Sequence, residues 1–137
     1  FYCDSAYINE VKNSFEAFSN VHIKVNDTVE VYGSRLLYDG NSKIAELFDS
    51  VKLIDKNTVL TTDHLIYNRI TKTALYDNGG KIVNKDNILI SRWGLYFTKT
   101  RTFHFRDDVV LTNPDQETYS DTLIYNTNNE TAAAHEK

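Results

Sequence analysis

The sequence predicts an all-β fold of about nine long antiparallel strands in one domain. Three observations predict it: a repeat of 29 residues, apolar residues that alternate with polar ones, and turn-forming clusters between the apolar segments. The 137 residues are enough for one domain of usual size. Hydrophobic residues make up 41% and charged residues 25% of the chain, which is typical of a globular protein.

The repeat gives the domain organisation. The six residues DHLIYN at 63–68 return as DTLIYN at 121–126, and a tyrosine recurs every 29 residues at Tyr38, Tyr67, Tyr96 and Tyr125. Repeats of this length indicate stacked units, none of which buries its apolar face alone. We therefore expect one domain of about four and a half units over residues 1–131. Residues 132–137 depart from the repeat, and we expect a tail there, compatible with an addition made in cloning.

Each unit contains two strand-like segments separated by clusters such as DGNS, NKDN and NPDQ. In the second segment of every unit, apolar residues share one parity. In the second unit, for example, Leu47, Val51 and Leu53 alternate with Glu46 and Lys52. A period of two with one apolar side indicates strands that are buried on one face. Sustained helical spacing of apolar residues is missing from the sequence.

These strands are about twice the usual length of five or six residues, so we expect them to bend in the middle. A small or polar pair occupies the middle of each second strand: Ser19–Asn20, Asp49–Ser50, Asn78–Gly79 and Asp107–Asp108. The first strands carry similar pairs: Cys3–Asp4, Gly33–Ser34, Thr62–Asp63, Ser91–Arg92 and Ser120–Asp121. Such residues tolerate bends and bulges. The prediction is a creased sheet whose two halves face each other across an apolar slot.

Three segments carry a resemblance to a known family: FYCDSAYINEVKNSFEAFSNV, LLYDGNSKIAELFDSVKLID and LIYNRITKTALYDNGGKIVN. Together they resemble the OstA-like family, and the resemblance covers about residues 1–131. It implies a creased, semi-open β-jellyroll of LptA/OstA type, whose apolar interior holds lipid A acyl chains and whose end strands join edge to edge. The sequence departs from the family pattern at Phe103, in a position of alanine, and at Trp93–Gly94, in an aliphatic position.

The resemblance implies a periplasmic module that carries or bridges lipopolysaccharide, or a similar amphiphilic lipid, toward the outer membrane. It also implies other OstA-like domains as partners through edge-strand pairing. Phe1 opens inside a repeat, so we expect a signal peptide, where there is one, to precede this fragment. The candidate slot-lining residues are Phe15, Ala17, Val21, Leu47, Val51, Leu53, Tyr76, Ile82, Phe103, Phe105, Val109 and Leu111.

The alternative is a structural β-repeat module that docks other envelope proteins by edge-strand pairing, without lipid. The two readings differ in whether the slot is filled by the protein's own side chains. The aromatic cluster around Trp93 and Phe103 fits either a packed core or a ligand slot.

Other functional classes are poorly supported. A net charge of −4 disfavours nucleic acid as a partner. Cys3 is the only cysteine, and the four histidines have no metal-ligand spacing, so we expect no metal and no cofactor. Asp107 and Asp108 are adjacent in a strand and point to opposite faces, so they do not form a catalytic pair. We therefore expect no enzymatic activity. No apolar run approaches the roughly 18 residues of a membrane span.

Overall fold

The structure, a computed structural model, describes residues 2–25 and 28–135. Within these ranges the chain forms one antiparallel sheet of twelve strands. None of the described residues belongs to a helix that is long and apolar enough to cross a membrane. The strands are β1 (Ser5–Asn9), β2 (Ser14–Lys24), β3 (Val29–Asp39), β4 (Ile44–Asp55), β5 (Thr58–Asn68), β6 (Thr73–Tyr76), β7 (Gly80–Asn84), β8 (Asn87–Ser91), β9 (Trp93–Phe97), β10 (Thr102–Thr112), β11 (Glu117–Asn126) and β12 (Thr131–His135).

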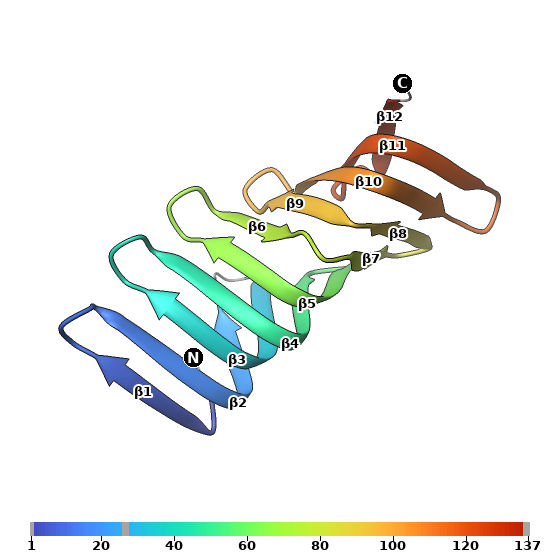
Figure 1. Cartoon of the computed structure of the whole chain (residues 1–137). Coiled ribbons are helices and arrows are strands. Elements are labelled where there is room, and N and C mark those ends of the chain that lie inside the picture. Colours follow the sequence, from blue (N-terminus) through green and yellow to red (C-terminus); the bar gives the residue numbers. More distant parts are fainter. Residues whose placement is uncertain (1, 26–27, 136–137) are drawn as a thin grey trace.

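The sheet is a meander in which successive long strands pair with one another (Figure 1). β6 and β7 together pair along β5, while β9 and β8 together pair along β10, so each of these couples is one long strand interrupted at its middle. The predicted arrangement of long antiparallel strands is therefore confirmed. The sheet also runs into the expected tail, because Thr131–His135 pairs with β11. Residues 1, 136 and 137, at the ends of the predicted domain and tail, lie outside the described residues.

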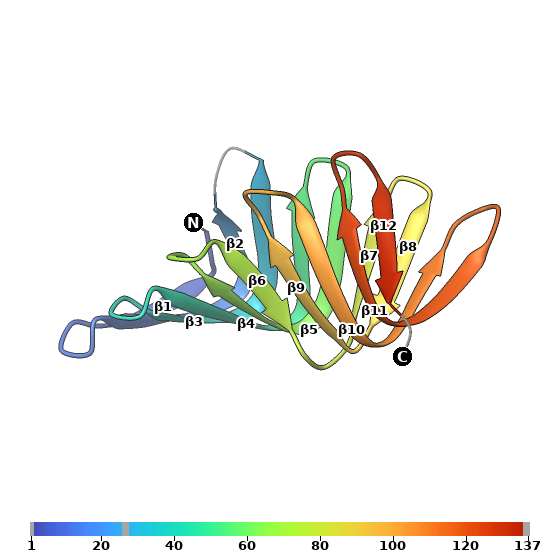
Figure 2. The ribbon, with the colours of Figure 1, turned by 90° about the horizontal axis from the view of Figure 1, so that it is seen from above.

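The long strands fold over at their middles, so the sheet consists of two facing layers (Figure 2). Layer I contains β1, β6, β9, β12 and the halves of the other strands that pair with them. Layer II contains β7, β8 and the remaining halves. The layers meet along the line of bends and separate toward the turns at the strand ends, which gives the semi-open shape predicted for the fold.

The bend in the second strands is a left-handed backbone step at the predicted pairs. Both residues have positive φ at Ser19–Asn20, Asp49–Ser50 and Asp107–Asp108, with values from 52° to 67°. The pairing register shifts at these places, as it does where a strand contains extra residues. In the interrupted strand between β6 and β7 the positive φ falls on Gly79. Small or acidic residues suit this conformation because their side chains are short.

The first strands bend in a different way. None of the described pairs Gly33–Ser34, Thr62–Asp63 and Ser120–Asp121 has a positive φ. Instead, a side-chain hydroxyl hydrogen-bonds the carbonyl oxygen two residues further on, from Thr62 to His64, from Ser91 to Trp93 and from Ser120 to Thr122. These hydroxyls lie one repeat apart, and each satisfies a carbonyl group beside the bend.

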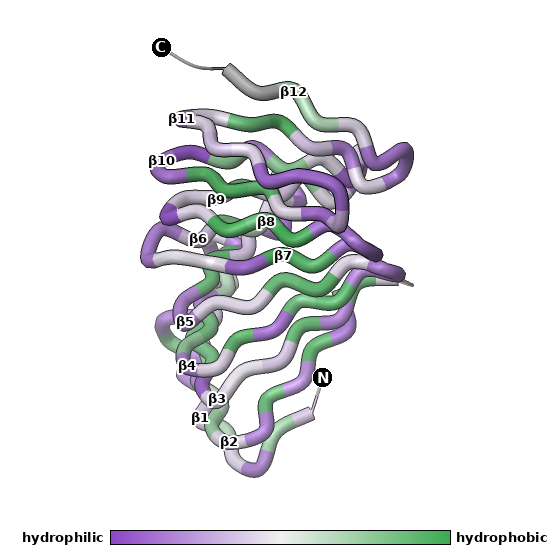
Figure 3. Tube along the Cα trace, turned by 90° about the vertical axis from the view of Figure 1, so that its right-hand side faces the viewer, coloured by the Kyte–Doolittle hydropathy of each residue, from purple (hydrophilic) through white to green (hydrophobic). Residues whose placement is uncertain are grey.

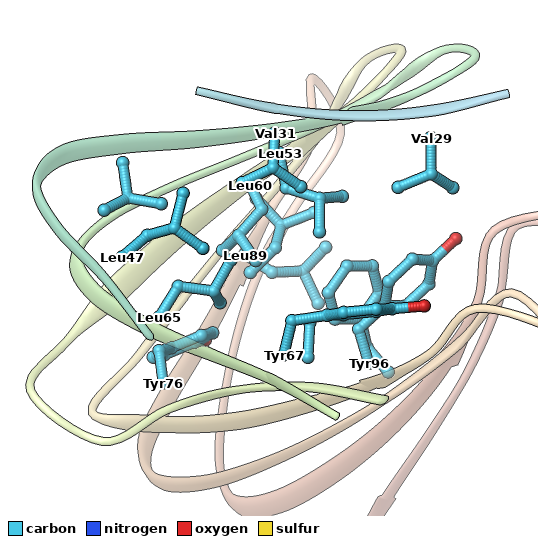
Figure 4. Close-up of a cluster of buried hydrophobic side chains, with 14 of the residues drawn as sticks. Val29, Val31, Leu47, Leu53, Leu60, Leu65, Tyr67, Tyr76, Leu89 and Tyr96 are labelled. Carbon is cyan, nitrogen blue, oxygen red and sulfur yellow. The ribbon is translucent and has the colours of Figure 1, made fainter. Parts of the chain in front are cut away.

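The interior between the layers is apolar. Apolar stretches recur in strand after strand (Figure 3), and their buried side chains form one cluster that includes Val31, Leu53, Leu60 and Leu89 (Figure 4). Of the twelve residues predicted to face the slot, all are buried except Phe15, which is partly buried and packs against the cluster. The alternating pattern therefore coincides with the buried face of the sheet.

Candidate ligand cavity between the two layers

One row of residues crosses layer I next to its turns, and we call it the inner rung. Each member is the register partner of the next: Ile8, Phe15, Tyr38, Ala45, Tyr67, Ala74, Tyr96, Phe103, Tyr125 and Ala132. The four repeated tyrosines are members of this row. Between them the row carries small residues at Ala45 and Ala74 and a large one at Phe103. Space in the interior therefore depends on which residue separates two tyrosines.

A cavity of about 180 Å³ lies in the interior beside the first part of the inner rung. Ala45 contributes only a methyl group there, between Tyr38 and Tyr67. The cavity is lined mainly by apolar side chains from β2 to β5: Phe15, Ile23, Val25, Val31, Leu36, Tyr38, Ala45, Leu47 and Tyr67. The interior is therefore partly open in this half of the domain.

Two cationic residues, Lys24 and Arg69, also line the cavity. A guanidinium nitrogen of Arg69 donates a hydrogen bond of 3.0 Å to the hydroxyl of Tyr38, and the guanidinium lies 5.9 Å from the centre of that ring. Within the described residues, Arg69 has no carboxylate partner in an ion pair. Burial raises the pKa of Tyr67, and a hydrogen bond with Thr98 and the charge of Arg69 offset part of that rise, so Tyr67 stays neutral at physiological pH.

The interior beyond Ala74 is filled by aromatic rings. Tyr96 and Phe103 stack with ring centres 4.1 Å apart, and Phe103 stacks on Phe105 at 5.2 Å. Phe103 is fully buried. The phenylalanine in the alanine position therefore has a structural role, because its ring fills the interior at the position where Ala45, two repeats earlier in the same row, leaves space open.

The glycine in the aliphatic position also has a packing role. Tyr76 lies between Gly80 and Gly94, and a Cβ atom added to Gly94 would come within 2.3 Å of the Tyr76 ring. The buried Tyr76 hydroxyl hydrogen-bonds Ser91 at 2.6 Å. Burial raises the pKa of Tyr76 far above its ordinary value, and the Ser91 bond offsets part of that rise. Gly94, which has no side chain, thus leaves room for the Tyr76 ring of the neighbouring strand.

A polar cluster joins the two layers at Tyr96, and we call it the Asp55 clasp. The Tyr96 hydroxyl donates a hydrogen bond of 2.6 Å to the Asp55 carboxylate at the end of β4. Arg101 donates to the other oxygen of Asp55 at 3.1 Å and to the hydroxyl of Thr28 at 3.1 Å. Asp55 is only 2% exposed. Burial, then the hydrogen bond to Asp55 and then the Asp55 charge raise the pKa of Tyr96, which keeps its hydroxyl protonated as the donor.

A second clasp joins the layers one repeat further along. The Tyr125 hydroxyl donates to Asn84 at 2.7 Å and accepts a hydrogen bond from Asn87 at 3.0 Å. The ammonium group of Lys85 lies 3.3 Å from a carboxylate oxygen of Glu130. Each clasp therefore combines a tyrosine of the inner rung with an ion pair between opposite turns. Both close the interior in the half of the domain that the aromatic rings fill.

The structure divides the predicted slot residues into two groups. Phe15 and Leu47 line the cavity, whereas the other ten lie elsewhere in the packed interior. The lining residues Tyr38, Ala45, Tyr67 and Arg69 were not among the predicted site residues. The 29-residue spacing of the tyrosines and alanines is the sequence signal that points to Tyr38, Ala45 and Tyr67.

Three of the four histidines that were considered as metal ligands, His22, His64 and His104, lie on the outer faces. His22 stacks on Tyr32 with ring centres 4.3 Å apart, and His64 stacks on Phe48 at 4.9 Å. His64 is also 3.1 Å from a carboxylate oxygen of Glu46. The side chain of His135 is outside the described part of the structure. Among the described residues, no three His, Cys, Asp or Glu side chains are placed to hold a metal ion.

A folded-over β-meander with a partly hollow apolar interior defines the class of protein as a β-repeat module with an internal cavity. A family model described as "OstA-like protein" matches residues 1–132, and the chain belongs to this family. A search of curated proteins found no match.

The structure is similar to the crystal structure of LptH, the LptA homologous periplasmic component of the conserved lipopolysaccharide transport device from Pseudomonas aeruginosa. The TM-score is 0.70, the sequence identity is 12%, and the match covers 80% of this chain and 82% of that chain. The shared property is the fold, which confirms the predicted LptA-like β-jellyroll.

Proposed function

We propose that this domain is a periplasmic, non-enzymatic module that binds lipopolysaccharide, or a similar amphiphilic lipid, through an acyl chain in the cavity beside Ala45. The cavity is the observation that carries the proposal, because it is apolar and lies between layers whose turns are apart. Membership of the OstA-like family and the fold shared with a periplasmic component of a lipopolysaccharide transport device support it.

The size of the cavity limits what it holds. Its volume of about 180 Å³ is below the roughly 300–1,000 Å³ of pockets that enclose drug-sized ligands. Part of one acyl chain fits such a space, and the rest of a larger amphiphile lies outside it. Lys24 and Arg69 line the same cavity, so an anionic group at the head of the chain finds cationic partners there.

A second candidate function, docking of another β-domain, is favoured by the free edge of β1. Among the described strands, β1 pairs only with β2, and the β1 hairpin exposes Tyr7, Ile8 and Val11 by 71%, 77% and 97%. At the opposite end, the described partner of β12 is β11. Edge strands with unpaired backbone groups add strands from a partner. We propose that another OstA-like domain pairs there, with or without lipid.

The experiment that tests lipid binding is photo-crosslinking with lipopolysaccharide. A photoreactive residue is placed in turn at Leu47, at its outward-facing neighbour Glu46, at Phe105 and at its neighbour His104. We expect an adduct from Leu47 alone, because Leu47 lines the cavity whereas Phe105 lies in the filled half. Equal adducts from all four positions, or none from Leu47, would refute the proposal and leave edge docking as the function.

A filling variant makes the result specific to the cavity. In Ala45→Phe, the new ring would lie between Tyr38 and Tyr67, as Phe103 already does between Tyr96 and Tyr125. The variant is therefore expected to fold while losing the adduct from Leu47. An adduct that persists in a folded Ala45→Phe protein would place the lipid elsewhere.

A further inference from the structure

The cavity is apolar inside and cationic where it meets solvent. Its walls are buried at Val31, Leu36 and Leu47. Lys24, the last residue of β2, and Arg69, in the turn after β5, line the same cavity but are exposed. Lys24 lies in layer II, whereas Arg69 follows the half of β5 that belongs to layer I. Each layer therefore contributes one cation to the mouth of the cavity.

Arg69 is held in place by neutral groups. Its backbone N–H donates to the carbonyl oxygen of Lys43 at 2.9 Å, and its guanidinium donates to the hydroxyl of Tyr38 at 3.0 Å. Of the five arginines in the chain, three pair with a carboxylate, and Arg106 lies over the ring of Trp93. Within the described residues Arg69 forms no such ion pair, so its charge is available to a ligand.

The chemistry of the guanidinium narrows the class of ligand. The bond to Tyr38 occupies one of its five N–H donors, and its planar fork matches the oxygens of a carboxylate or a phosphate. A hydrogen bond from arginine to such an oxyanion is stronger than one to a neutral hydroxyl. At the mouth of an apolar cavity, this preference favours an amphiphile with an acidic head.

We propose that Arg69, positioned by Tyr38, determines head-group specificity by binding the carboxylate or phosphate at the head of the acyl chain, with Lys24 as a second cation. This inference rests on the proposed lipid-binding function. It gives the ligand an orientation, with the acidic head at the turns and the chain directed toward Leu47. It also makes a neutral amphiphile of equal chain length a weaker ligand.

The experiment compares three ligands with the same saturated chain: decanoate, decyl phosphate and decan-1-ol. Titration calorimetry at neutral pH measures their affinities below the concentrations at which they aggregate. The wild type should bind each acid at least about tenfold more tightly than the alcohol, because a hydrogen bond to a charged group contributes that much. Arg69→Gln should lose most of this preference, about fivefold or more, while its affinity for the alcohol is unchanged.

Two further variants separate a local effect from a general one. Arg92→Gln removes the same charge from an exposed arginine that does not line the cavity, so it should keep the wild-type preference. Tyr38→Phe keeps the ring in the cavity wall and removes the acceptor of the Arg69 hydrogen bond. It should weaken binding of the acids and leave binding of the alcohol unchanged, which a general loss of packing would not do.

The two acids distinguish the possible heads, because tighter binding of decyl phosphate would indicate a phosphate and tighter binding of decanoate a carboxylate, and either result supports the proposal. Circular dichroism establishes that each variant is folded. A folded Arg69→Gln protein that keeps the wild-type preference, or an equal loss in Arg92→Gln, would overturn the proposal. A wild type that binds the alcohol as tightly as both acids would overturn it as well, and would leave the proposed function intact. A wild type that binds none of the three ligands would refute both.

Discussion

Tyr96 and Asp55 lie on opposite layers of the folded sheet, and the hydroxyl of Tyr96 donates a hydrogen bond of 2.6 Å to the Asp55 carboxylate. The two residues are 41 positions apart, and the same separation relates Tyr125 to Asn84 in the second clasp. The repeat thus reproduces a contact between layers as well as a pattern within each strand. The two copies differ in charge, because only the first places a carboxylate in the interior.

The charged clasp should be the more sensitive of the two to loss of its cation. Arg101→Gln leaves the buried Asp55 without its ion-pair partner, and breaking such a pair typically costs about 3–5 kcal/mol. The control is Lys85→Gln, which removes an exposed ion pair and should cost less than about 1 kcal/mol. Arg101 and Lys85 have φ of 55° and 54°, so backbone strain is matched. Urea denaturation measures both, and equal losses would contradict the burial argument.

The buried tyrosines should make the fold sensitive to base. Burial is the largest cause that raises the pKa of Tyr67, Tyr76, Tyr96 and Tyr125 above the ordinary value of 10.0. Below that pH, both the folded and the unfolded chain keep these hydroxyls protonated. Above it, the unfolded chain loses the protons while the folded chain retains them, so stability falls as pH rises.

Substitution of one tyrosine checks this base sensitivity. In Tyr96→Phe, the free energy of unfolding above about pH 10 should fall less steeply than in the wild type, by up to about 1.4 kcal/mol per pH unit. Urea denaturation at a series of alkaline pH values measures the two slopes. Identical slopes would show that Tyr96 ionises equally easily in both states.

The packing of Tyr76 against Gly94 predicts a coupled pair. Gly94→Ala places a methyl group within 2.3 Å of a buried ring, and such overpacking typically costs about 1–3 kcal/mol. The loss should shrink in a Tyr76→Leu background, because the ring is then absent. At Gly33 an added Cβ would lie 3.3 Å from Leu47, so Gly33→Ala should cost less. A double-mutant cycle with no coupling between Gly94 and Tyr76 would contradict this account.

The bends predict a test of backbone conformation. Ser50 has a φ of 52° in the left-handed region, where a β-branched side chain is strained by roughly 1–2 kcal/mol. Ser50→Val should lose about that much stability, whereas Ser50→Gly should lose little. Lys52→Val, two residues further along β4 and outside the left-handed region, is the control and should be nearly neutral. Thermal unfolding compares the three, and an equal loss for Lys52→Val would exclude strain as the cause.

Much of this fold could be predicted from local sequence. Apolar and polar residues such as Leu47 and Glu46 alternate along a strand, and the pair Asp107–Asp108 marks a bend. Each of these signals depends only on neighbours within a few positions, so the sequence alone reveals it. The family pattern then supplies the way in which the bent strands stack. Local sequence does not indicate that the sheet continues into β12, because the alanines there lack the repeat signature.

The extent of the cavity could not be predicted in the same way. Whether an interior is hollow depends on the sum of volumes from many strands, and a single exchange of Ala45 for a residue like Phe103 changes it. The Asp55 clasp depends on partners 41 and 46 residues away, which no local pattern connects. Ten predicted slot residues consequently lie on the buried face of the sheet but outside the cavity.

The edge of β1, which pairs only with β2 among the described strands, gives the last prediction. Ile8 and Ala132 are the two ends of the inner rung, so head-to-tail pairing of β1 with the β12 of another copy would continue the row. Ile8→Lys places a charge where the incoming strand would lie, and charged side chains on edge strands oppose pairing. We expect this change to reduce self-association, or docking of a separate OstA-like domain, by at least about tenfold, because the apolar contact of Ile8 with the incoming strand is lost and a lysine is desolvated in its place.

The control is Val11→Lys, since Val11 is also apolar and even more exposed but lies in the turn after β1. Analytical ultracentrifugation of the three proteins measures the association constants. Equal weakening by both lysines would indicate nonspecific apolar contact, and no change with Ile8→Lys would exclude the β1 edge as the docking site.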